Sequence, residues 1–125
     1  MKKIFLLSLL FLTACQANGE KLNGTTYQYQ LNNTPITIAF DKDENRYYGK
    51  VVNNYFGTYS IQNNKITFHP AGATMMMGPE NEMKAEQDWF HLLSQITHFT
   101  KEDNTLILTL KNGQTIKLEH TPISD

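Results

Sequence analysis

Short segments in which apolar and polar residues alternate constrain the fold of this chain more than any other feature of its sequence. The alternation is clear in residues 27–31, 36–40 and 106–110. Because successive side chains of a β-strand point to opposite faces, each such segment predicts a strand with one buried face. We expect strands over residues 25–31, 36–40, 46–52, 56–61, 65–69, 98–101, 105–110 and 115–120.

Turn residues separate these segments. Asn112-Gly113 is the strongest hairpin signal, and Asn63-Asn64 can adopt the positive φ that a two-residue hairpin needs. Residues 41–45 look like the start of a calcium loop, but Arg46 and Val52 stand where that loop needs Gly and Glu. Residues 41–45 are therefore predicted to form a solvated turn.

One helix is predicted between the fifth and sixth strands. Pro79 suits its first turn. Its apolar residues recur at helical spacing and form one stripe, whereas Glu86 and its polar neighbours fall on other faces. Trp89 is expected to lie in the core. The stripe consists of Ala85, Trp89, Leu92, Leu93 and Ile96.

Strands, then a helix, then strands again indicate a mainly β (α+β) fold with an antiparallel sheet rather than parallel βαβ units. Curling of about seven to eight short strands into a barrel-like closure removes exposed strand edges. We therefore expect an antiparallel, barrel-like sheet with one packed helix, formed by residues 25–120. Residues 121–125 are expected to be a C-terminal tail.

The first fifteen residues are similar to a bacterial lipoprotein signal. Two lysines precede an apolar segment, residues 4–12, that is too short to span a bilayer. The segment ends at Leu12-Thr13-Ala14-Cys15, which resembles a lipobox. The resemblance implies that residues 1–14 are removed and that Cys15 is acylated. The alternatives are an ordinary signal peptide and a buried free cysteine.

The resemblance to a lipobox also implies a location. Residues 15–24 would be the lipidated cysteine and a flexible tether, and several acyl chains would anchor the chain stably in a membrane. By resemblance to Gram-negative sorting, Gln16 after the cysteine favours the outer membrane, with the domain facing the periplasm.

Charge and composition exclude several kinds of site. The 125 residues carry a formal net charge of -1, so no basic excess exists to neutralise the phosphates of a nucleic acid. The single cysteine rules out an intrachain disulfide and a thiolate-rich zinc site. Neither a phosphate loop nor a nucleophile elbow occurs. We expect no enzymatic activity, cofactor or metal, since no metal-ligand spacing joins His69, His91, His98 and His120.

Three stretches together resemble the META domain, the HslJ-like family of heat-shock lipoproteins. Residues 22–27 resemble its opening Leu-x-Gly-x-x-Trp, with Tyr27 in place of Trp. Residues 52–59 resemble Cys-Asn-x-Tyr/Phe-x-Gly-x-Tyr, and residues 74–79 resemble the Thr-x-Met-x-Cys segment before the helix. The resemblance covers about residues 22–119. It implies a mainly antiparallel, barrel-like sheet with a helix, an association with envelope stress and secretion, and no established catalytic residues.

Both cysteine positions of some relatives are occupied by other residues, Val52 and Gly78. If those cysteines pair in relatives, the loss of both leaves no orphan thiol, and packing alone must replace the bond.

Two segments are candidate binding surfaces. The methionines at 75–77 suit an adaptable contact surface; the alternative is that two of them fill the core. Residues 53–59 could form a recognition surface; the alternative is a turn held by asparagine side chains. The candidate binding residues are Asn53, Asn54, Tyr55, Tyr59, Thr74, Met75, Met76 and Met77.

The first functional hypothesis is a non-enzymatic, lipid-anchored envelope protein of the META/HslJ type that presents these residues to an envelope protein partner. Two further hypotheses stay open. One is a binder of a small apolar ligand in the mouth of the barrel, and the other is an inhibitor of an envelope or host hydrolase.

Overall fold

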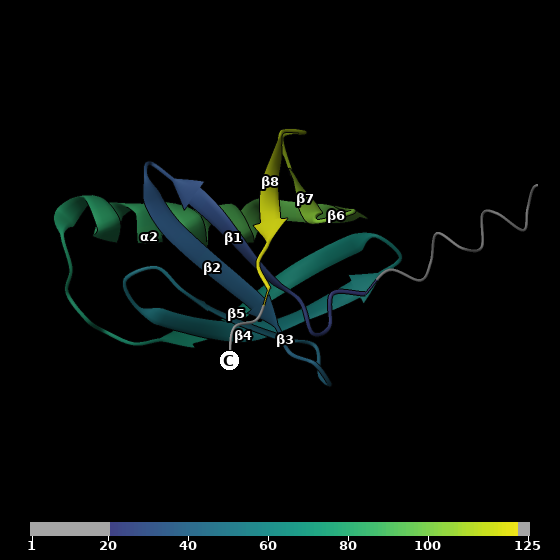
Figure 1. Cartoon of the computed structure of the whole chain (residues 1–125), viewed down its shortest axis with the longest axis horizontal. Coiled ribbons are helices and arrows are strands. Elements are labelled where there is room, and N and C mark those ends of the chain that lie inside the picture. Colours follow the sequence, from purple (N-terminus) through teal and green to yellow (C-terminus); the bar gives the residue numbers. More distant parts are fainter. Residues whose placement is uncertain (1–20, 123–125) are drawn as a thin grey trace, which may run out of the picture.

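Eight strands and one helix make up residues 21–122, the part of the chain that the computed structural model describes (Figure 1). Strands that are consecutive in sequence pair antiparallel, and β8 returns to pair with β1, so the sheet closes into a barrel. The predicted antiparallel, barrel-like sheet with one helix is confirmed. The elements are β1 (Thr26–Leu31), β2 (Thr34–Phe40), β3 (Arg46–Lys50), β4 (Asn54–Gln62), β5 (Lys65–Ala73), α2 (Glu80–Gln95), β6 (Ile96–Glu102), β7 (Thr105–Leu110) and β8 (Thr115–His120).

Several boundaries differ from the sequence prediction. Strand β2 starts two residues earlier, and β5 continues past residue 69 to Ala73. Ile96, expected on the helical stripe, begins β6 instead. Its backbone is extended (φ -77°, ψ 135°), although its N–H still donates to the carbonyl of Leu93. The helix therefore passes into the strand with no loop between them.

The predicted turns occur where asparagine and glycine supply positive φ. Asn32 and Asn33 (φ 51° and 65°) link β1 to β2, Asn63 (φ 60°) lies between β4 and β5, and Gly113 (φ 92°) lies between β7 and β8. In the turn after β2, the Asp41 carboxylate accepts hydrogen bonds from the two backbone N–H groups of residues 43 and 44. These bonds hold the pKa of Asp41 below its usual 3.8.

Inward-facing residues of every strand fill the barrel, and helix α2 packs against it through Trp89. That side chain is fully buried, as predicted, and its ring lies 5.9 Å from the ring of Tyr29 on β1. Glu86 departs from the expectation that it faces away from the core, because only 6% of it is exposed. Among residues 21–122, no helix has the length and apolar character needed to cross a membrane.

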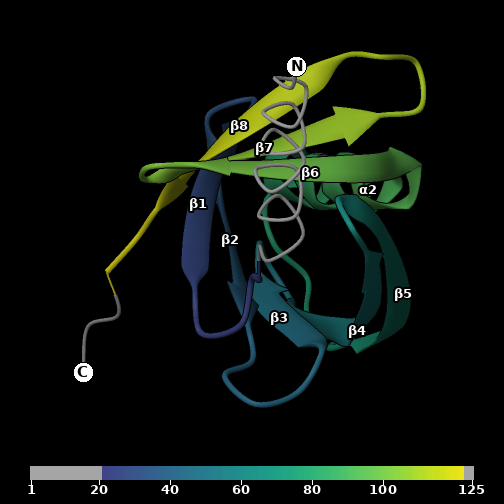
Figure 2. The same ribbon diagram turned by 90° about the vertical axis from the view of Figure 1, so that its right-hand side faces the viewer.

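The barrel closes weakly at one seam. Strands β5 and β6 pair only at Lys65 and His98, so most of β5 has no strand on that side. Figure 2 shows β5 turning away from β6, with α2 close to the gap. Phe90 and Leu93 of the helix line a pocket there together with the end of β5.

Candidate functional site

The loop between β5 and α2 exposes its methionines. Met75 and Met77 are 94% and 88% exposed, and Met76 is 47% exposed. None of the three lies in the core, so the alternative that two of them fill it does not apply. Three exposed thioether side chains in succession form a small apolar surface, which we call the Met loop (residues 74–79).

A buried hydrogen-bond network fixes the backbone of this loop. The side-chain oxygen of Asn53 accepts from the Thr74 hydroxyl (2.8 Å) and from the Met76 N–H, and its amide group donates to the Met76 carbonyl (3.2 Å). Thr74 also accepts from the N–H of Asn54 (3.1 Å). Asn53 is 3% exposed and uses both ends of its amide. The Met loop is therefore exposed but held in place.

Glu86 of α2 completes this hydrogen-bond network. Its carboxylate accepts from the backbone N–H groups of Val52 (3.0 Å) and Asn53 (2.7 Å) and from the side-chain amide of Asn53 (2.9 Å). These bonds connect α2 to the segment just before β4. Because Asn53 also bonds to the Met loop, they connect the Met loop to the helix as well. This role of Glu86 could not be predicted from the sequence, because a lone glutamate on a helix is usually solvated.

The predicted tyrosines of this region point inward. Tyr55 is 4% exposed; its hydroxyl donates to the Thr37 carbonyl (2.6 Å) and accepts from the Trp89 indole N–H (2.8 Å). Tyr59 is 3% exposed, and its hydroxyl has no hydrogen-bond partner within residues 21–122. Of the segment 53–59, the structure thus leaves Asn54 exposed and places Asn53, Tyr55 and Tyr59 in the interior.

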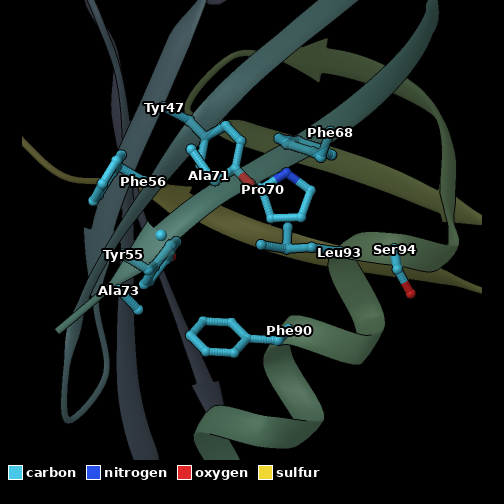
Figure 3. Close-up of a pocket in the computed structure, with 11 residues that line it drawn as sticks. Tyr47, Tyr55, Phe56, Phe68, Pro70, Ala71, Ala73, Phe90, Leu93 and Ser94 are labelled. Carbon is cyan, nitrogen blue, oxygen red and sulfur yellow. The ribbon is translucent and has the colours of Figure 1, made fainter. Parts of the chain in front are cut away.

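An apolar pocket of about 450 Å³ lies between the end of β5 and α2 (Figure 3). Small residues of segment 70–73 form one side, and Leu93 and Ser94 of the helix form part of the other. The 11 residues that line it carry no charge. The rest of its wall is aromatic and consists of Tyr47, Tyr55, Phe56, Phe68 and Phe90.

Two glycines make room for the tyrosines of this wall. Tyr47 pairs across the strands with Gly57, and Tyr55 pairs with Gly49. A Cβ on Gly57 would lie 2.7 Å from the Tyr47 hydroxyl oxygen, and one on Gly49 would lie 2.5 Å from that of Tyr55. Each ring therefore lies over a residue that has no side chain.

Burial raises the pKa of Tyr47 to about 12, and the pKa of Tyr55 rises further for the same reason. Both hydroxyls are therefore protonated at neutral pH. The Tyr55 hydroxyl already has a donor and an acceptor, whereas no hydrogen bond joins the Tyr47 hydroxyl to another group within residues 21–122.

Metal-ligating side chains do not gather in the described residues. Nowhere in residues 21–122 do three or more His, Cys, Asp or Glu side chains gather as metal ligands. A second hollow, near the turn after β2, is lined mainly by polar side chains. The predicted lipidation site, Cys15, lies outside the described residues.

Val52 and Gly78, the positions of cysteines in some relatives, are neighbours in space. A Cβ built on Gly78 would lie 3.7 Å from the Cβ of Val52. Disulfide-bonded cysteines have Cβ atoms about 3.5–4.5 Å apart. The two positions therefore have the geometry of a bridge between the segment just before β4 and the end of the Met loop.

Solved structures of two bacterial proteins share the fold. A protein from Burkholderia xenovorans superposes with a TM-score of 0.65 at 20% identity, over 80% of this chain and 83% of its own. A DUF4847 family protein from Bacteroides vulgatus gives a TM-score of 0.55 at 15% identity, over 71% of this chain and 61% of its own. No curated protein matches the sequence. The META domain profile matches residues 13–122, so this chain belongs to the META domain family.

Proposed function

We propose that this chain is a non-enzymatic, lipid-anchored protein of the cell envelope that binds a protein partner through the Met loop. The observation that carries the proposal is that Met75 and Met77 are almost fully exposed on a backbone that Asn53 fixes. An exposed apolar group on a fixed backbone loses little conformational entropy on binding. Methionine adapts its shape to the partner.

The position of the loop supports a partner away from the membrane. In Figure 1 the loop that leads from β5 into α2 lies at the opposite end of the long axis from the start of the described chain. Acyl chains on Cys15 would hold the chain to the bilayer from the Lys21 side. The loop would then point into the periplasm, and Gln16 after the predicted lipidated cysteine supports the outer membrane as the site of the anchor.

Metabolic labelling with palmitate tests the anchor. The wild-type chain should incorporate the label and fractionate with the outer membrane, and the Cys15→Ser variant should do neither. Labelling of the serine variant, or an unlabelled wild-type chain, would contradict the anchor and leave the fold unaffected.

Site-specific photo-crosslinking in intact cells tests the surface. A crosslinker at Met77 should yield a discrete adduct with an envelope protein, and one at Lys117, exposed on β8, should not. Replacing Met75, Met76 and Met77 by Gln should weaken recovery of that partner without lowering the melting temperature, since these side chains do not fill the core. Adducts from both positions, or unfolding of the triple variant, would contradict the proposal.

A further inference from the structure

The apolar pocket arises because the barrel seam is incomplete. Strand β5 runs for nine residues but pairs with β6 at only one of them, Lys65. Phe90 and Leu93 of α2 stand across the gap from segment 70–73 and leave about 450 Å³ between them. This volume falls within the range of about 300–1,000 Å³ that small-molecule sites have. The pocket thus lies where β5 and β6 separate, and not inside the barrel.

The lining specifies an uncharged ligand that carries a ring. No charged side chain borders the pocket, so an ionised ligand would lose its hydration without a compensating partner. Five of the 11 lining residues are aromatic, and Phe90 meets Tyr55 edge to face with ring centroids 5.4 Å apart. Aromatic side chains favour stacked or edge-on contact with another ring.

One polar group in the wall has no partner. Tyr47 is 2% exposed, and its hydroxyl takes part in no hydrogen bond with residues 21–122. The hydroxyl is not among the fully enclosed unpaired polar atoms of residues 21–122, and Tyr47 lines the pocket, so a molecule in the pocket can reach this hydroxyl and bond to it. The hydroxyl of Tyr55, in the same wall, is satisfied by Thr37 and Trp89 and needs none.

The free side of β5 does not suit a peptide that would add a strand. Pro70 has no N–H to offer, and Ala71 is the extra residue of a bulge, because Phe56 pairs with Gly72 and Gly57 with Pro70. Proline and bulges are the devices that prevent an exposed edge from pairing. The space beside this edge therefore fits a compact molecule better than an extended chain.

We propose that the pocket between β5 and α2 binds a small, uncharged, ring-bearing molecule that hydrogen-bonds to the hydroxyl of Tyr47. The residues of this pocket are not those of the Met loop, so this proposal does not depend on the proposed protein partner. The ligand's polar group is a hydroxyl or carbonyl placed at one edge of the ring, where it meets Tyr47, and its apolar body lies between Phe90 and segment 70–73.

A matched pair of probes tests the proposal. The probes are 2-naphthol and 2-methylnaphthalene, which are similar in size and differ in the hydroxyl group. Both should shift the amide NMR signals of Ala73 and Phe90 in a saturable way. The ratio of the affinity for 2-naphthol to that for 2-methylnaphthalene should be about five- to tenfold higher in the wild-type chain than in Tyr47→Phe, equivalent to about 1–1.4 kcal/mol.

The variant Tyr47→Phe keeps the ring and removes only the hydroxyl, so its affinity for 2-naphthol should fall while its affinity for 2-methylnaphthalene stays unchanged. Tyr48→Phe makes the same change on the neighbouring residue, which is half exposed and lies outside the pocket, and should keep the preference. The absence of saturable shifts with either probe, or an unchanged preference in Tyr47→Phe, would overturn the proposal.

Discussion

A double substitution, Val52→Cys with Gly78→Cys, is expected to form a disulfide that the natural chain lacks. The Cβ positions are 3.7 Å apart, close to the mean of about 3.8 Å found in disulfides. Gly78 has no positive φ, so a side chain at this position meets no backbone strain. The bond would join the segment just before β4 to the end of the Met loop, two residues before α2.

The expected gain follows from the size of the loop that is closed. Residues 52–78 enclose a loop of about 27 residues, for which the chain-entropy relation gives about 3.5 kcal/mol at 25 °C. Loss of the half-buried Val52 side chain will offset part of this gain. A net stabilisation of about 2–3 kcal/mol should raise the melting temperature by roughly 10 °C in a domain of this size.

The assay is thermal and urea unfolding of the double variant, oxidised and reduced, in a chain that carries Cys15→Ser so that only the new thiols are present. Each single variant serves as a control for the cost of its own side chain. Thiol titration reports whether the bond forms. If the oxidised double variant keeps two free thiols, or if oxidation leaves the midpoint unchanged, the inferred adjacency of the two positions is wrong.

Three further predictions concern buried polar and aromatic groups. Glu86→Ala should lower the free energy of unfolding by about 2–6 kcal/mol in urea denaturation, because two buried donors of Asn53 would each lose an acceptor worth about 1–3 kcal/mol. Gly57→Ala should cost about 1–3 kcal/mol or more in the same assay, because the added Cβ would lie 2.3 Å from the backbone carbonyl oxygen of His69 and 2.7 Å from the Tyr47 hydroxyl oxygen. Above pH 10 stability should fall, because burial raises the folded-state pKa of Tyr47 from 10.0 to about 12 and that of Tyr55 further. The unfolded chain then loses these protons first, so urea midpoints should be flat from neutral pH to pH 10 and decline towards pH 12, less steeply for Tyr47→Phe.

Strands and turns could be predicted from the sequence because the signals are local. A period of two identifies a strand without knowledge of its partner, and the Asn-Gly pair at 112–113 specifies a hairpin by its own φ preference. The continuation of β5 to Ala73 could not be found this way. Apolar and polar residues do not alternate in segment 69–73. Its place in the sheet depends on its pairing with β4 across a bulge.

The pocket could not be predicted because it depends on a missing contact. Nothing local to β5 or β6 indicates that they pair at a single position, and the pocket exists only because they separate beyond it. In the sequence, Tyr47 has the pattern of an ordinary inward residue of a strand. Only the three-dimensional structure shows that its hydroxyl makes no hydrogen bond within residues 21–122.

The residues that carry the family resemblance serve mainly the interior. Asn53 fixes the Met loop, Tyr55 joins α2 to β2, Gly57 lies under a tyrosine ring, and Thr74 is bound to Asn53. A shared motif of this kind specifies a fold and says little about what the fold binds. Differences in function within such a fold must come from positions that the interior leaves free, which here are the exposed side chains of the Met loop and the lining of the seam pocket.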